Sequence, residues 1–207
     1  MKKNNLYISV MGTMGSGKTT ASRIIAKAFK LKLIEENFGE NLFLPRFYKD
    51  MKRWAFHSQT FFLMEKIAQM METSKIIHKK SFIQDTPIQQ DAFSYAKAQH
   101  VLGNIDDAEW RLYQKIYYSF EPHFPTSDLI IYLDTSIPVL VKRIEARGRS
   151  YEKKIPKSYI ELLDMLNLKW IRNIKDVKVL KINTDNLNIV RSEFAKKEFI
   201  QIVKSKL

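Results

Sequence analysis

Short apolar runs alternate with longer segments of helical periodicity along this chain. The apolar runs cover residues 6–11, 32–35, 82–85, 129–134 and 177–182. Most of them are hydrophobic throughout, as expected for strands that are covered on both faces in a parallel sheet. Between them, hydrophobic residues recur at helical spacing over residues 18–29, 52–79, 88–102 and 106–120. The alternation predicts a three-layer α/β/α fold built on a five-stranded parallel sheet.

The amino-acid composition agrees with this fold class and excludes several classes of site. The 207 residues are 45% hydrophobic and 28% charged, with no linker or low-complexity segment, which predicts one domain over residues 1–207. The chain has no cysteine, which excludes disulfides, zinc–thiolate sites and thiol nucleophiles and suits a reducing cytoplasm. No apolar run approaches the ~18 residues of a membrane span. The first residues are interpreted as a strand leading into a glycine turn, not as an export signal.

The formal net charge of +13 raises the question of nucleic-acid binding. However, the lysines and arginines are spread along the chain among acidic residues, and no basic tail or nucleic-acid-binding motif accompanies them. We therefore expect no nucleic-acid partner and no membrane partner.

The strongest motif follows the first apolar run. Residues 12–19 match the phosphate-loop pattern G-x-x-x-x-G-K-[ST] between a strand and a helix. Glycines let consecutive backbone N–H groups converge on phosphate oxygens, lysine adds a point charge, and the threonine hydroxyl suits magnesium. The predicted nucleotide-binding residues are Gly12, Thr13, Met14, Gly15, Ser16, Gly17, Lys18, Thr19 and Thr20.

A phosphate loop needs an acid near its magnesium, and two acids end apolar runs. Asp85 closes residues 82–85, and Asp134 closes residues 129–134 but then begins a turn. We interpret Asp134 as a turn or helix-start residue and assign Asp85, with Thr19, to the metal.

An arginine-rich stretch lies near residues 143–155, where Arg147 and Arg149 flank Gly148, a natural helix stop. Cations on a mobile segment can close over a triphosphate, and they can also simply oppose a helix dipole. Beside a phosphate loop we favour a helical lid.

Four blocks in the same order as in a known family then give a specific resemblance, which extends from residue 12 to about Trp170. They are the phosphate loop, residues 34–48, residues 48–59 and residues 84–95. With them the chain resembles the deoxynucleoside kinases, the group that includes deoxycytidine, deoxyguanosine and bacterial deoxyadenosine kinases. Residues 183–186 fall where the adenine loop of that family would lie.

The resemblance implies roles for individual residues. It makes Glu36 the base that accepts the proton of the sugar 5′-hydroxyl, in preference to Glu35, and makes Lys18, Arg147 and Arg149 the groups that stabilise charge. The remaining matches concern the acceptor: Tyr48 and Glu152 at the sugar 3′-hydroxyl, Gln59 and Asp91 at the base, and Tyr95 stacking on the base.

One position departs from the family pattern. Where the family has an arginine after the acid, this chain has Thr86. Such an arginine would hold the donor phosphate and the catalytic acid, a contribution of several kcal/mol in similar sites. Arg46, Arg147 and Arg149 are candidates to compensate for it; without compensation the chain would be a slow kinase, one with an altered acceptor, or a protein that only binds.

The leading hypothesis is ATP-dependent, magnesium-dependent phosphorylation of the 5′-hydroxyl of a deoxynucleoside by a homodimer. One alternative is another nucleoside or nucleotide kinase of this fold, such as a thymidylate kinase-like enzyme, whose monophosphate acceptor needs a cation such as Arg46. The other is a catalytically weak nucleotide-binding regulatory subunit. The sequence leaves the preferred base open, because a glutamine amide suits adenine and cytosine equally.

Overall fold

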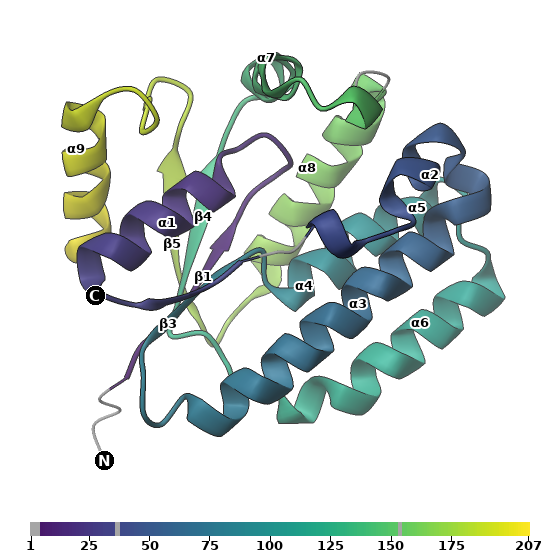
Figure 1. Cartoon of the computed structure of the whole chain (residues 1–207), viewed down its shortest axis with the longest axis horizontal. Coiled ribbons are helices and arrows are strands. Elements are labelled where there is room, and N and C mark those ends of the chain that lie inside the picture. Colours follow the sequence, from purple (N-terminus) through teal and green to yellow (C-terminus); the bar gives the residue numbers. More distant parts are fainter. Residues whose placement is uncertain (1–4, 36–37, 153–154) are drawn as a thin grey trace.

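The computed structural model describes residues 5–35, 38–152 and 155–207. Its centre is a sheet of five parallel strands in the order β2-β3-β1-β4-β5 (Figure 1). The strands are β1 (Tyr7–Met11), β2 (Lys32–Ile34), β3 (Phe82–Asp85), β4 (Leu129–Asp134) and β5 (Lys178–Asn183). The predicted five-stranded parallel sheet is therefore confirmed, with four of the ten strand ends shifted by one residue.

Helices cover both faces of the sheet and make the three layers (Figure 1). One face packs on α1 (Lys18–Phe29) and α9 (Glu193–Lys204) through a core that includes Ile8, Val10 and Phe199. The other face packs on α3 (Met51–Ile76), α6 (Asp107–Phe120) and α8 (Lys157–Asn173). Because helices cover both faces, β1, β3 and all but the last residue of β4 are buried without alternation, although β3 ends in the polar residues Gln84 and Asp85. In the edge strand β5, exposed and buried positions alternate over most of its length.

The segment 88–102 differs from the prediction of one regular helix. It consists of α4 (Ile88–Gln90), a π-helical segment (Asp91–Ala96) and α5 (Lys97–Val101). A π-helical turn holds one extra residue per hydrogen-bonded ring, and such turns occur frequently at functional sites. Hydrophobic periodicity cannot reveal it, because every residue from Ile88 to His100 is buried or half-buried and no exposed face marks the helical phase.

Two shorter helices complete the end of the molecule that carries the site. The short α2 (Leu44–Lys49) precedes α3, and α7 (Ile137–Arg147) ends at Gly148 in the left-handed region with φ 70°. A 3₁₀ turn (Ser150–Glu152) follows, and it contacts α2. Within the described residues, no helix is long and apolar enough to cross a membrane.

The start of α6 is fixed by a reciprocal cap, which gives a direct test of the fold. The Asp106 carboxylate accepts from the backbone N–H groups of Ala108 and Glu109, and the Glu109 carboxylate accepts from the Asp106 N–H at 3.0 Å. We expect Asp106→Ala to lower the free energy of unfolding by about 1 kcal/mol in urea titrations. Asp176→Ala, at an exposed position outside the helices, is the charge-matched control and should change it less. Equal effects of the two substitutions would contradict the cap.

Candidate active site

The phosphate loop leaves β1 at the carboxyl edge of the sheet and leads into α1. Gly15 has φ 85°, and a side chain there would meet Ile144 Cγ1 at 2.9 Å and the Leu140 carbonyl at 3.0 Å. A Cβ atom at Gly12 would lie 2.5 Å from the Ser16 hydroxyl oxygen and 2.9 Å from the Leu133 carbonyl oxygen. Both positions therefore require glycine, because a side chain has no space there and because the backbone angles, φ 85° at Gly15 and 153° at Gly12, disfavour other residues. Met14 anchors the loop by packing with α7 and α8 side chains.

Two side chains meet at the carbonyl oxygen of Gly12. Lys18 Nζ donates to this oxygen at 2.9 Å, and Gln90 Nε2 donates to it at 2.6 Å. The Gln90 amide oxygen in turn accepts from the Gly12 N–H at 3.4 Å. Gln90 is buried in α4, so an amide from beyond β3 holds the first residue of the phosphate loop by both of its backbone groups.

The acid predicted for the metal lies beside the loop threonine. Asp85 ends β3, adjacent to β1, and its Oδ2 accepts from the Thr19 hydroxyl at 2.6 Å. The other oxygen, Oδ1, accepts from the Thr86 hydroxyl at 3.3 Å. A hydroxyl and one carboxylate oxygen are a fitting partial donor set for Mg²⁺, which takes most of its remaining ligands from water and phosphates. The second candidate, Asp134, pairs with Lys181 of β5 at 3.1 Å.

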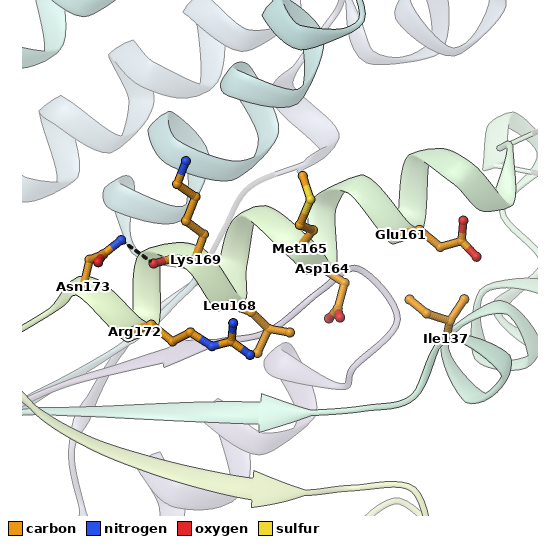
Figure 2. A pocket seen from close by; sticks show the side chains of 8 residues that line it. All are labelled: Ile137, Glu161, Asp164, Met165, Leu168, Lys169, Arg172 and Asn173. Atoms are coloured by element: carbon orange, nitrogen blue, oxygen red, sulfur yellow. Dashed lines mark hydrogen bonds between the residues drawn. The ribbon is translucent and has the colours of Figure 1, made fainter.

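Behind the loop, α8 supplies a second polar anchor. Thr13 Oγ1 donates to Asp164 Oδ1 at 2.9 Å and accepts from Asn167 Nδ2 at 3.2 Å. Asp164 also lines a groove of about 520 Å³ along α8 (Figure 2). None of the described residues lining this groove belongs to the predicted site. Burial raises the pKa of Asp164 above its ordinary value, although the hydrogen bond from Thr13 opposes the shift.

The lid arginines converge on one acid. Arg147 binds Glu152 Oε2 through Nε at 3.0 Å and Nη2 at 2.6 Å, and Arg149 Nη1 reaches Oε1 at 3.3 Å. Glu152 is buried, with 5% of its surface exposed. Tyr48 stacks on Tyr151 with ring centroids 5.4 Å apart, so α2 and the lid turn bring Tyr48 and Glu152 into one neighbourhood. Burial raises the pKa of Tyr48 well above its ordinary value, and the Glu152 charge adds to this effect.

The residues predicted for the base lie on elements that pack together. Gln59 is buried in α3, Asp91 is buried in the π-helical segment, and these two elements are in contact. Tyr95, from the same segment, packs in the cluster that contains Met14 and Tyr159. The π-helical segment thus carries both Asp91 and Tyr95.

Glu36, the predicted base, lies outside the described residues. Its neighbour Glu35 forms an exposed ion pair with Arg23, with Nε–Oε1 2.5 Å and Nη2–Oε2 3.1 Å. The hydrogen bond from Arg23 holds the pKa of Glu35 below its ordinary value. The choice of Glu36 over Glu35 as the base therefore stays a prediction.

Sequence reasoning missed several residues that contact the site. Arg143 donates to the Ser16 carbonyl at 3.3 Å and to the carbonyl and hydroxyl of Thr184 at 2.5 and 3.1 Å, joining the loop to residues 183–186. Gln90 and Asp164 were missed because nothing in their local sequence marks them. Lys66 was also missed, although a lysine three residues after Leu63 and four before Met70 lies at a buried phase of α3.

This chain is similar to known proteins over nearly its whole length. The sequence model of the deoxynucleoside kinase family matches residues 8–207. A deoxyadenosine/deoxycytidine kinase of Bacillus subtilis is 31% identical, with 91% of this chain and 87% of that protein covered. A deoxyguanosine kinase of the same organism is 34% identical over 76% of this chain and 74% of its own length. The solved structure of a Mycoplasma mycoides deoxyadenosine kinase with bound dCTP superimposes with a TM-score of 0.83 at 26% identity, covering 97% and 98% of the two chains.

The two donors on the Gly12 carbonyl predict a role for Gln90 in nucleotide binding. When Lys18 turns to a phosphate, Gln90 remains as the donor to the carbonyl; removing it leaves a buried acceptor unpaired, at a cost of about 1–3 kcal/mol. We therefore expect Gln90→Leu to weaken ATP binding roughly 5- to 150-fold by titration calorimetry. Gln89→Leu, one residue earlier and without a contact to Gly12, is the control. Equal ATP affinity in the two variants would refute the role.

Asp164 predicts a pH dependence of stability. Because its pKa is raised in the folded protein, the folded state binds a proton more readily than the unfolded state in the window above the ordinary value of 3.8. The contribution of this carboxyl to the free energy of unfolding therefore falls as the pH rises through that window.

Asp164→Asn removes this titration and keeps the Oδ1 acceptor for Thr13. We expect the stability of the variant relative to the parent to increase between about pH 3.5 and pH 7 in urea titrations. Glu161→Gln, on the same helix and exposed, should show no such trend. A relative stability that is flat with pH would show that the carboxyl is not perturbed.

Proposed function

This chain belongs to the deoxynucleoside kinase family, and we propose that it transfers the γ-phosphoryl group of ATP to the 5′-hydroxyl of a deoxynucleoside. The products would be ADP and the deoxynucleoside 5′-monophosphate. The observation that carries the proposal is the contact of Thr19 with Asp85 at 2.6 Å, beside a complete phosphate loop, in a chain that matches the family over residues 8–207. It brings Asp85, the acid that we assign to the metal, and the phosphate loop to one edge of the sheet.

On the donor side, the loop residues bind and orient the triphosphate. The N–H groups of Gly12 and Ser16 are paired with Gln90 and Thr13, so the other N–H groups of the loop and the amino end of α1 would attract phosphate oxygens. Lys18 exchanges the Gly12 carbonyl for the β- and γ-phosphates, while Gln90 keeps that carbonyl paired. Thr19 and Asp85 would hold Mg²⁺, which when bound neutralises charge on the transferring group.

On the acceptor side, buried polar groups fix the deoxynucleoside. Tyr48 and Glu152 would bind the 3′-hydroxyl, and Gln59 and Asp91 the base edge, with Tyr95 stacking on the ring. Glu36 would accept the proton of the 5′-hydroxyl as the phosphoryl group moves. Gln59 and Asp91 are buried, so a poorly matching base would be costly, because it would leave amide or carboxylate atoms unpaired.

The lid would couple the donor side of the site to the acceptor side. Arg147 and Arg149 now pair with Glu152, an acid that we assign to the sugar. Binding of a deoxynucleoside would give Glu152 a new partner and release positive charge toward the phosphates, where phosphoryl transfer gains most from it. Positive charge would thus be delivered when both substrates are present.

We also propose that the protein is a homodimer and acts in the cytoplasm. α3 and α6 expose the apolar side chains of Met64, Leu112 and Tyr118, which favours a homodimer through these helices. The absence of cysteine favours a reducing compartment, and we place the enzyme in the cytoplasm. The similar proteins are deoxynucleoside kinases, which favours neither a monophosphate kinase nor a regulatory subunit.

The direct test is ATP consumption by purified protein with each of the four natural deoxynucleosides and with thymidine monophosphate. We expect turnover with at least one deoxynucleoside, a 5′-monophosphate product by mass spectrometry, and loss of about 10²-fold or more in kcat for Glu36→Gln. The matched control is Glu35→Gln, which should retain most of the activity. Turnover with the monophosphate alone, or ATP binding without turnover, would replace the proposal by one of the two alternatives.

A further inference from the structure

A buried lysine lies beneath the acid that faces the phosphate loop. Lys66 comes from the middle of α3, and 1% of its surface is exposed. Its Nζ donates to the carbonyl oxygen of Asp85 at 3.1 Å and to that of Thr86 at 2.6 Å. Lysine is almost never fully buried unless its charge is compensated, because desolvation opposes the charged form. Two of the contacts that compensate Lys66 are to the turn after β3, so this lysine ties α3 to that turn.

The turn that Lys66 binds is strained. Thr86 has φ 59°, in the left-handed region that a β-branched residue adopts only under constraint. The turn is held on three sides: Thr86 N–H donates to the Val10 carbonyl at 3.1 Å, the Thr86 hydroxyl contacts Asp85 Oδ1, and Lys66 binds both carbonyls. Without Lys66, two buried carbonyls would lose this donor at a backbone conformation that threonine disfavours.

The consequence of this constraint is the orientation of Asp85. Its Oδ2 meets the Thr19 hydroxyl, so a rotation of the turn would move the carboxylate away from the phosphate loop. We propose that Lys66 is a positioning residue for phosphoryl transfer: it fixes the Asp85–Thr86 turn so that Asp85 and Thr19 share one metal ion, and it adds a fixed positive charge beneath that site. This inference deepens the proposed function and rests on it.

The same geometry bears on the absent arginine. Position 86 carries threonine, and the candidates considered from the sequence have other contacts: Arg147 and Arg149 bind Glu152, and Arg46 lies over the Trp54 ring at 5.1 Å. Lys66 instead reaches position 86 directly from another element. In this chain the cation at the turn is thus supplied by α3.

The test compares Lys66→Met, which is one atom shorter than lysine and removes its donors, with Lys75→Met on the same helix. Lys75 is exposed and pairs with Glu72 at the surface. Three quantities are measured for each: the melting temperature, the factor by which Mg²⁺ tightens ATP binding over EDTA in calorimetry, and kcat and KM for the preferred deoxynucleoside.

We expect Lys66→Met to bind ATP in EDTA like the parent, to lose most of the tightening by Mg²⁺, and to lose roughly 10²-fold in kcat, the scale of a misplaced catalytic group. KM for the deoxynucleoside should change less than about threefold. Adding Thr86→Arg to Lys66→Met should recover about tenfold in kcat, since it returns a cation to the turn. Lys75→Met should match the parent in all three quantities.

Several outcomes would overturn the inference. A folded Lys66→Met protein with the kcat and Mg²⁺ response of the parent would do so, as would a change confined to KM or to the choice of base. If Lys66→Met does not fold, Lys66→Gln, which is neutral but keeps two donor hydrogens, is judged by the same criteria. Loss of folding in both, with full rescue by Lys66→Arg, would make Lys66 purely structural. A parent protein that turns over no deoxynucleoside would instead remove the proposed function, whereas the Mg²⁺ effect on ATP binding still tests the role of Lys66.

Discussion

The site depends on one constraint: the phosphate loop must present unpaired backbone N–H groups to an anion while its own carbonyls stay paired. When a loop turns its N–H groups inward to bind phosphate, these groups cannot pair with its own carbonyl oxygens, which must find donors on other elements. Here the Gly12 carbonyl is paired by Lys18 and Gln90, and the Ser16 carbonyl by Arg143. The loop can therefore give up Lys18 to a ligand without collapsing, because its other partners come from separate elements.

The partners reach the loop from every layer of the fold. Parallel strands bring the ends of β1, β3 and β4 to one edge, which places Asp85 beside Thr19. α8 reaches the back of the loop with Asp164, and α3 reaches the turn after β3 with Lys66. Each of these contacts is buried or partly buried, where a polar group is costly unless it is paired. The geometry of the site therefore depends on how the layers of the fold pack against one another.

The sequence predicts the parts of this arrangement that follow from local pattern. Apolar runs indicate the parallel sheet, and the spacing of Gly12, Gly17 and Lys18 indicates the loop, because each depends on residues close in the chain. The π-helical segment at Asp91–Ala96 could not be predicted, since the segment is buried or half-buried at every position and offers no exposed face from which a shift in helical phase could be read. Gln90, Asp164 and Lys66 could not be predicted for another reason: each contacts the site across a long sequence separation, and only the folded structure shows the contact.

The measurement that tests this account most directly is a structure of the protein with an unreactive ATP analogue, Mg²⁺ and a deoxynucleoside. The account predicts that Lys18 has left the Gly12 carbonyl for the phosphates while Gln90 still holds it. It also predicts one metal ion between Thr19 and Asp85, and a 5′-hydroxyl directed at the γ-phosphate. A triphosphate bound elsewhere, or a Gly12 carbonyl that has lost Gln90 and changed its backbone conformation, would contradict the central claim.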